Sequence, residues 1–158
     1  MLRIDNKIKL IISDFDGIFT DGKVIVNCDG STSKRLSFLD VMGVSLLIKN
    51  NIKLAIISGD KSSAIDYIAN RFSLEDVYQD IRVKFPIVLE LIKKYNLNLN
   101  QVAYIGDDVN DLEVLSYIPN NFTVPNANYK VKAIKGIQIT HANGGDGAFR
   151  ELVDSVLY

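Results

Sequence analysis

The residues of this chain best suited to chemistry are Asp14 and Asp16, which follow the apolar run at residues 8–12. Such a run is typical of a buried parallel strand, and open α/β sheets bind ligands at the carboxyl ends of these strands. Two neighbouring carboxylates repel each other, which favours a cation between them or a proton on one of them. The pair therefore predicts a nucleophile or metal ligand beside a proton donor, although an isolated Asp-x-Asp is more often a simple acidic turn.

Two later strand ends carry further polar groups. Ser58 and Gly59 follow the apolar run at residues 52–57, at a predicted strand-to-helix junction where backbone amides favour phosphate. Residues 106–111, Gly-Asp-Asp-Val-Asn-Asp, follow another apolar run and place three acids within six residues. Both segments also have structural interpretations, because serine caps helices and acids favour a helix start.

The composition restricts the class of protein. The 158 residues are 47% hydrophobic and 23% charged, which predicts one globular domain over residues 1–158. The net charge of −1 gives no electrostatic basis for binding nucleic acid or an anionic membrane. The single cysteine, Cys28, fits a reducing compartment, and no apolar stretch is long enough for a signal peptide or a membrane span. We therefore expect a cytoplasmic protein.

Strand and helix patterns alternate along the chain, which predicts an α/β fold with a doubly wound, mostly parallel sheet. Two β-prone runs flank Asp29-Gly30, so residues 22–38 are expected to form a β-hairpin beside the site, with a neighbouring subunit as a candidate for covering it. No insertion is long enough for a cap domain, and Asp40 is predicted to cap a helix ending near Asn50. Further strands are expected at residues 52–58, 76–78, 101–105, 121–124 and 137–139, and further helices at 61–72, 82–95, 108–116, 128–133 and 147–156.

The motif around Asp14 and Asp16 resembles the first motif of the haloacid dehalogenase-like phosphatases, Asp-x-Asp-Gly-x-x-Thr-Asp-Gly. The resemblance continues, in the family's order, at residues 58–61, at Lys84 and at residues 106–111. It implies that Asp14 attacks phosphorus to form an aspartyl phosphate, and that Asp16 protonates the leaving oxygen and then activates water. Ser58 and Lys84 would complete the catalytic set by holding the phosphoryl group, and Lys84 would also neutralise charge on Asp14. The resemblance alone singles out Lys84.

The same resemblance implies a Mg²⁺ cofactor, which offsets the repulsion between a carboxylate nucleophile and a phosphate dianion. The expected protein ligands are the carboxylates of Asp14 and Asp107 and the backbone carbonyl of Asp16. Asp108 and Asp111 are further candidate ligands, and Asp111 is alternatively expected to contact the ligands without binding the ion itself.

Within this family the chain most closely resembles the capless sugar-acid phosphatases, on residues 20–22, 78–79, 103–108 and 144–151. The resemblance implies a nonulosonate (sialic-type) 9-phosphate or 3-deoxy-D-manno-octulosonate 8-phosphate as substrate, in the biosynthesis of sialic acid, lipopolysaccharide or other surface polysaccharides. Asp60 favours the nine-carbon acid, because the octulosonate enzymes usually carry arginine there. The family resemblance also implies a homotetramer in which the hairpin of one subunit closes the neighbouring site. The expected substrate-binding residues are Thr20, Gly59, Asp60, Lys61, Arg71 and Arg150, of which the three cations are candidates for holding the substrate carboxylate.

Two alternatives come from other functional classes. A catalytically silent module of the same fold can accompany a sugar-nucleotide cytidylyltransferase, but such a module need not keep Asp14, Asp16, Lys84 and Asp107. A phospho-receiver domain also combines acids, a hydroxyl and a lysine on a doubly wound sheet. The acid pair at one strand end and the hairpin after it disfavour the receiver domain.

Overall fold

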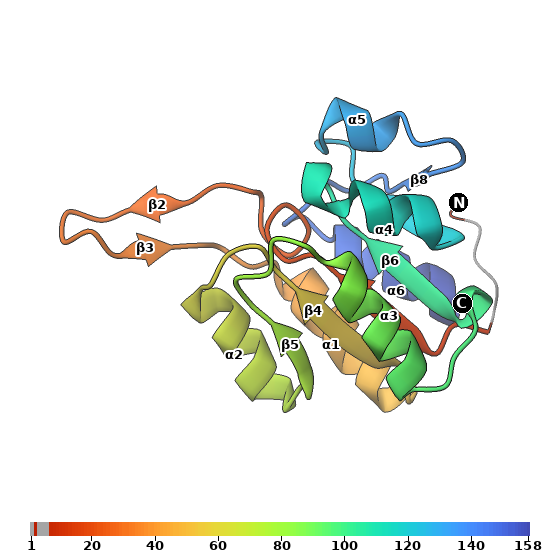
Figure 1. Ribbon diagram of the computed structural model, residues 1–158. Helices are drawn as coiled ribbons and strands as arrows, with labels where there is room; N and C mark the ends of the chain where they lie inside the picture. Colours follow the sequence, from red (N-terminus) through yellow and green to blue (C-terminus); the bar gives the residue numbers. More distant parts are fainter. Residues whose placement is uncertain (1, 3–6) are drawn as a thin grey trace.

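The computed structural model describes residue 2 and residues 7–158. Its centre is a six-stranded sheet in the order β5-β4-β1-β6-β7-β8, in which every neighbouring pair is parallel (Figure 1). The predicted doubly wound parallel sheet is therefore confirmed. The strands are β1 (Leu10–Ser13), β4 (Lys53–Ile57), β5 (Asp76–Tyr78), β6 (Val102–Ile105), β7 (Asn120–Thr123) and β8 (Gln138–Ile139).

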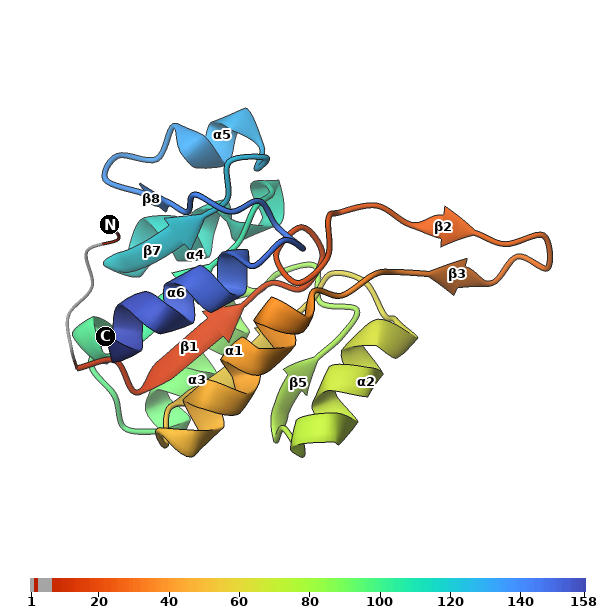
Figure 2. The same ribbon diagram turned by 180° about the vertical axis from the view of Figure 1, so that it is seen from behind.

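Helices cover both faces of the sheet (Figure 2). One face carries α1, α2 and α6, and the other carries α3 and α4, with α5 beside α4 near the β8 edge of the sheet. The helices are α1 (Phe38–Lys49), α2 (Ser63–Phe72), α3 (Phe85–Lys94), α4 (Leu112–Tyr117), α5 (Tyr129–Lys132) and α6 (Ala148–Leu157), with 3₁₀ turns at Leu99–Gln101 and Val109–Asp111. None of the helices in the described part of the chain is long and apolar enough to cross a bilayer.

The central strands are buried on both sides because their alternate side chains enter two different cores. In β1, Ile11 packs with α1, α2 and α6, whereas Leu10 and Ile12 pack with α3 and α4. The continuous apolar run that predicted this strand is thus explained by a sheet that exposes neither face. The chain order reverses between β1 and β6, which is the point where open α/β sheets place their ligand crevice.

The predicted hairpin is confirmed. Strands β2 (Ile25–Val26) and β3 (Thr32–Ser33) pair antiparallel, and the turn between them contains Gly30 with a positive φ of 83°. The hairpin projects well beyond the rest of the protein, with both of its ends at the loop after β1 (Figures 1 and 2). Ile25 and Val26 are exposed, so the hairpin contributes almost nothing to the core.

The prediction that Asp40 caps α1 is wrong. The cap is Ser37, whose extended backbone lets its hydroxyl accept a hydrogen bond from the N–H of Leu39 at 3.2 Å. Asp40 is instead buried in the first turn of α1 and accepts bonds from the N–H groups of Gly147 at 3.1 Å and Arg150 at 3.0 Å. It therefore caps α6, a helix more than a hundred residues away, which no local sequence pattern can reveal.

The glycine loop that Asp40 holds packs against the loop after β1. The N–H of Gly145 donates to the carbonyl oxygen of Ile18 at 2.9 Å. A Cβ atom on Gly144 would lie 1.7 Å from the carbonyl oxygen of Gly17, so only glycine permits this approach. The two loops thus support each other directly beside Asp14 and Asp16.

Asp40 should make the stability of the protein dependent on pH. Burial, the largest effect, raises the pKa of the Asp40 carboxyl from 3.8 to about 6, although the N–H groups of Arg150 and Gly147 oppose the shift. The folded protein therefore holds this proton more tightly than the unfolded chain, so stability falls as pH rises from about 4 through 6. We expect the free energy of unfolding to fall by about 2 kcal/mol more than in Asp40→Asn over this range.

Urea unfolding of both proteins at pH 4, 5, 6 and 7 checks this expectation. The other buried acids titrate in both proteins, so only the difference between the two curves reports on Asp40. Parallel curves would show that Asp40 has the same pKa in the folded and unfolded states.

Candidate active site

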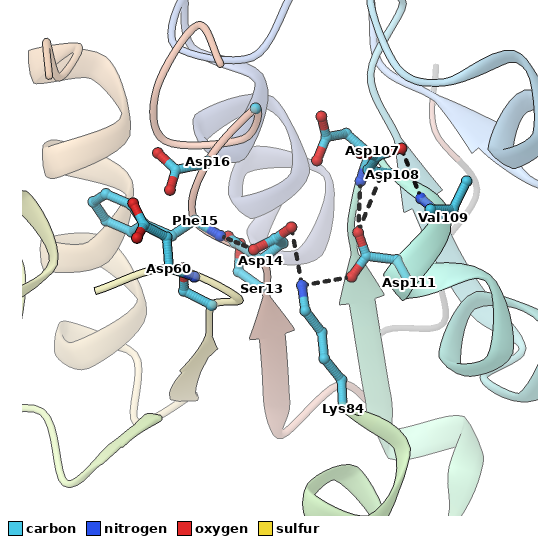
Figure 3. Close-up of polar contacts among 12 residues, drawn as sticks. Ser13, Asp14, Phe15, Asp16, Asp60, Lys84, Asp107, Asp108, Val109 and Asp111 are labelled. Atoms are coloured by element: carbon cyan, nitrogen blue, oxygen red, sulfur yellow. Dashed lines mark hydrogen bonds and ion pairs between the residues drawn. The ribbon is translucent and has the colours of Figure 1, made fainter. Parts of the chain in front are cut away.

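The carboxyl ends of β1 and β6 bring the two principal acidic motifs together. Asp14 follows β1, and its N–H donates to the carbonyl oxygen of Ile105 at the end of β6 at 2.9 Å. Asp107 and Asp111 follow β6, and one oxygen from each of Asp14, Asp107 and Asp111 lies within 4.8 Å of the others (Figure 3). Two motifs that are about 90 residues apart in the sequence therefore form one acidic cluster.

Lys84, at the start of α3, neutralises part of this cluster from below. Its Nζ lies 2.9 Å from Asp14 Oδ2 and 2.8 Å from Asp111 Oδ1, and its side chain is fully buried (Figure 3). Burial is the largest single effect and lowers the pKa of Lys84, but the charges of Asp14 and Asp111 outweigh it and the pKa is raised. The ammonium therefore stays charged beside Asp14 at neutral pH.

Asp111 holds the cluster together. Its Oδ1 accepts a bond from the Tyr104 hydroxyl at 2.5 Å as well as from Lys84, and its Oδ2 accepts from the N–H groups of Asp107 at 3.0 Å and Asp108 at 3.2 Å. A Cβ atom on Gly106 would lie 2.4 Å from the Asp111 carboxyl carbon. Asp111 thus positions Lys84 and the loop that carries Asp107. This agrees with the expectation that Asp111 orients the metal ligands through hydrogen bonds.

The single charge of Lys84 does not neutralise all the acids of the cluster, which include Asp14 and Asp107. Burial and the charge of Asp111 raise the pKa of Asp14 well above its usual range, although Lys84 opposes the shift. Burial and the charges of Asp111 and Asp108 raise the pKa of Asp107 to about 7. Both shifts mean that the ionised carboxylates are unfavourable without a cation, and a divalent ion would relieve them.

The donor set fits a hard cation such as Mg²⁺, which prefers carboxylate and carbonyl oxygens. A Cβ atom on Gly17 would lie 2.0 Å from Asp107 Oδ2, so the backbone of the Asp16-Gly17 segment runs directly against the Asp107 carboxylate. Asp108 differs, because its carboxylate accepts bonds from the N–H of Val109 at 2.8 Å and from Asn128 Nδ2 at 3.0 Å. The structure therefore groups Asp107 and Asp111 with Asp14 and leaves the Asp108 carboxylate outside the group.

A cavity of about 230 Å³ opens above the acidic cluster, and the loops after β1, β4 and β6 form its walls. A larger cavity of about 450 Å³ lies at the opposite ends of β4 and β5, around Asp76 and Tyr95, and contains none of the predicted site residues. The acidic residues that line the smaller cavity therefore identify it as the site. The smaller cavity is lined by Asp14, Asp16, Gly17, Gly22, Ser58, Gly59, Asp60, Asp107, Asp108 and Asn110.

Ser58, in the loop after β4, and Asp16, in the loop after β1, both line this cavity. The Ser58 side chain is buried, and its Oγ accepts a bond from the N–H of Asp60 at 3.1 Å, which leaves the hydroxyl proton to donate to a phosphate oxygen. Asp16 Oδ1 accepts a bond from Thr20 Oγ1 at 3.1 Å. Thr20 Oγ1 also accepts from the N–H groups of Gly17 and Gly22, both at 3.2 Å. The structure thus places the Thr20 hydroxyl inside the loop, where it orients Asp16, and away from the cavity wall.

The cations predicted to hold a substrate carboxylate lie in different places. Lys61 is exposed next to Asp60. Arg71 lies at the far end of α2 and donates to the Tyr67 hydroxyl at 3.1 Å, and Arg150 Nε donates to Asp154 on α6 at 2.7 Å. Neither arginine lines the cavity of its own chain.

Three residues of the site were not predicted from the sequence. Asn110 lines the cavity and lies within the recognised 106–111 motif, so its position already pointed to the site. Tyr104 lies in an apolar run, and its contact with Asp111 could not be distinguished from ordinary core packing. Lys34 in the hairpin contacts Asp16 and Asp60 across the cavity, and no local pattern identifies it.

Comparisons with known proteins agree with this geometry. A family model described as haloacid dehalogenase-like hydrolase matches residues 76–152. The 3-deoxy-D-manno-octulosonate 8-phosphate phosphatase of Yersinia pestis is 32% identical over 150 residues, which are 95% of this chain and 80% of that protein. This chain belongs to the sugar-acid phosphatases of the haloacid dehalogenase-like family. As a member of that family it is a phosphoric monoester hydrolase.

Solved structures of other members of this phosphatase family share the whole fold. The enzyme of the same name from Moraxella catarrhalis, in complex with magnesium, phosphate and a KDO molecule, has a TM-score of 0.90 and 34% identity over 96% of this chain and 87% of that chain. The cobalt-bound enzyme from Haemophilus influenzae has a TM-score of 0.88 and 30% identity over 96% and 88% of the two chains. These structures therefore share the fold over nearly all of this chain.

Proposed function

We propose that this protein is a Mg²⁺-dependent phosphatase that hydrolyses the phosphate ester of a sugar acid through an aspartyl phosphate. The observation that carries the proposal is the Asp14 carboxylate, which lies 2.9 Å from a buried lysine and beside Asp107 at the floor of a small polar cavity. A carboxylate in this setting can attack phosphorus while positive charge stabilises the phosphoryl oxygens.

The chain's own residues account for both chemical steps. A carboxylate oxygen of Asp14 forms a new bond to phosphorus, and the bond from phosphorus to the sugar oxygen breaks. The departing oxygen keeps the electron pair and takes a proton from Asp16. In the second step Asp16 takes a proton from water, the water oxygen bonds to phosphorus, and the aspartyl phosphate releases phosphate and the Asp14 carboxylate. Ser58, the amide of Gly59 and Lys84 hold the phosphoryl oxygens throughout.

The carboxylates of Asp14 and Asp107 and the backbone carbonyl of Asp16 would hold the magnesium ion, and Asp111 would orient the loop that carries Asp107. When bound, the ion supplies positive charge that lets a carboxylate approach a phosphate dianion. This assignment rests on the donor set and on the raised pKa values of Asp14 and Asp107. The magnesium in the Moraxella catarrhalis structure supports it.

The substrate we propose is a sugar-acid phosphate used to make surface polysaccharide, and there are two candidate sugar acids. The curated relatives carry the name of octulosonate 8-phosphate phosphatase. Asp60 lines the cavity, where its carboxylate can accept hydrogen bonds from hydroxyl or amino groups of a substrate. Both acids carry a carboxylate and hydroxyl groups, so the amino groups of a nine-carbon, sialic-type nonulosonate 9-phosphate are what favour it here. Asp60 is the residue on which the choice depends.

Phosphate release from a panel of sugar phosphates tests the function. With Mg²⁺ present, we expect turnover of a sugar-acid phosphate and little release from neutral hexose phosphates. EDTA should abolish turnover, because it removes the cation that compensates the negative charge of the acidic cluster. Added Mg²⁺ should restore turnover by compensating that charge again. A chain that releases phosphate from no ester on the panel would instead be a silent module, and turnover unaffected by EDTA would contradict the metal site.

We also propose that the protein forms a homotetramer in which the hairpins pack against neighbouring subunits. Val24, Ile25 and Val26 on the hairpin and Phe38 and Leu39 just after it are all more than half exposed. So many neighbouring apolar side chains on an edge are typical of a surface that another chain covers. We propose that the covering chain is a second copy of this protein, because the apolar hairpin projects from beside the catalytic site.

Multi-angle light scattering tests this assembly. We expect a mass of four chains for the wild type and a smaller species for Val26→Asp, since a charge would then be buried at the interface. Tyr129→Asp, at a similarly exposed residue of α5, should remain tetrameric. A monomeric wild type with full activity would contradict the proposed assembly.

A further inference from the structure

One lysine ties the hairpin to the cavity of its own chain. Lys34 follows β3 directly, and its Nζ lies 2.7 Å from Asp16 Oδ2 and 2.8 Å from Asp60 Oδ2. Only 7% of the Lys34 side chain is exposed, whereas Lys23 at the opposite base of the hairpin is 82% exposed. Lys34 is thus a buried part of the site, in contrast to the exposed Lys23.

The two acceptors of Lys34 stand on different walls of the cavity. Asp16 belongs to the loop after β1, and Asp60 belongs to the loop after β4. Since Lys34 bonds both, it connects these loops and the base of the hairpin at one point. Thr20 bonds the other oxygen of Asp16, so both carboxylate oxygens are held by neighbouring side chains.

The position of Lys34 differs from that of every other cation considered for the site. Lys84 Nζ is buried between Asp14 and Asp111. Arg71 and Arg150 are bonded elsewhere. Of these, Lys34 is the cation that touches the proton donor, and it comes from the same chain.

We propose that Lys34 is a positioning residue that acts within its own subunit, holding Asp16 at the angle needed to protonate the leaving oxygen. The inference rests on the proposed phosphatase function and extends it to the hairpin. It also revises the expected role of the hairpin, whose base serves its own active site even where its tip meets a neighbour. Loss of Lys34 should therefore harm proton donation more than phosphoryl transfer.

Esters with different leaving groups separate these two effects. A sugar alkoxide needs a proton in order to leave, whereas p-nitrophenolate leaves readily without one. We expect Lys34→Met to lower kcat/KM for the sugar-acid phosphate about 30- to 100-fold, around the lower end of the effect of general acid catalysis, and kcat/KM for p-nitrophenyl phosphate less than about threefold. The comparison uses kcat/KM because this ratio covers only the steps up to the aspartyl phosphate, whereas kcat also includes the later step in which Asp16 activates water for both esters. Lys23→Met removes the same charge from the same hairpin and should leave both rates unchanged. Equal losses on the two esters, or no loss, would overturn the positioning role.

Mixed oligomers test whether Lys34 acts within its subunit. Chains carrying Lys34→Met and chains carrying Asp14→Asn are co-expressed with different tags, and the mixed species is purified. We expect no more activity than the Lys34→Met chains supply, because each intact Lys34 lies in a subunit without a nucleophile. Recovery toward the wild-type rate per intact Asp14 would show that Lys34 acts across subunits. If the wild type is monomeric and active, its own turnover establishes action within one chain.

A third measurement does not depend on turnover. Hydrogen exchange of the amides in residues 22–38 should be faster in Lys34→Met than in the wild type and in Lys23→Met, since the hairpin loses its attachment to Asp16 and Asp60. Unchanged exchange would overturn the attachment even if the protein hydrolysed no phosphate ester. Absence of all wild-type turnover with faster exchange in Lys34→Met would instead contradict the phosphatase function and leave the attachment established.

Discussion

Asp14→Asn should abolish hydrolysis of the sugar-acid phosphate, with kcat lowered by about 10⁴- to 10⁶-fold, as when other covalent nucleophiles are removed. The amide oxygen can still accept the 2.6 Å bond from the N–H of Phe15, so the loop after β1 should keep its shape. What is lost is the anionic oxygen that attacks phosphorus and the negative charge that faces Lys84. Steady-state phosphate release with Mg²⁺ measures the effect.

Asp80→Asn is the matched control for this variant. Asp80 is exposed and has a positive φ of 59°, a conformation that asparagine adopts readily, so this change removes one carboxylate without disturbing the backbone. Its rate should equal that of the wild type. Phosphate release by Asp14→Asn at a comparable rate would remove Asp14 from the role of nucleophile, and a phosphorylated Asp14 trapped by acid quench in the wild type would support it directly.

Lys84→Met should impair both catalysis and folding. Because the Lys84 ammonium is completely buried between Asp14 and Asp111, its loss leaves two carboxylates in the interior without their partner. We expect the free energy of unfolding to fall by about 3–5 kcal/mol, the usual cost of breaking a buried ion pair from one side. We expect kcat to fall by about 10²- to 10³-fold, as when a preorganised donor to a transition state is removed.

Urea unfolding and steady-state kinetics measure the two effects separately. Lys93→Met, which removes an exposed lysine from the same helix, should change neither. Added Mg²⁺ should restore part of the lost stability of Lys84→Met, because a divalent ion relieves the same carboxylates. A stable Lys84→Met with normal turnover would contradict the central place of Lys84 in the cluster.

The fold was largely predictable because its signals are local. Apolar runs of four or five residues marked the buried strands, and Asp29-Gly30 marked the hairpin turn, since these patterns reflect burial and backbone geometry over a few residues. Asp40 shows where local reasoning fails. Its position before an apolar helical stretch predicted a cap for α1, but burial against α6 directs its carboxylate to Gly147 and Arg150. A side chain bonds whichever donors the packing brings to it, and those donors are distant in the sequence.

The sequence by itself determined the acids of the site, their order and the parallel sheet that carries them. Asp14 and the 106–111 motif could be assigned to one crevice because parallel strands end at the same edge of a sheet. The family resemblance already placed Lys84 beside Asp14, and the structure agrees. Only the tertiary structure decided the other charge pairs: Lys84 with Asp111, Lys34 with Asp16 and Asp60, and Arg71 away from the cavity. Lysine and arginine side chains are long and flexible, so their partners depend on packing in three dimensions.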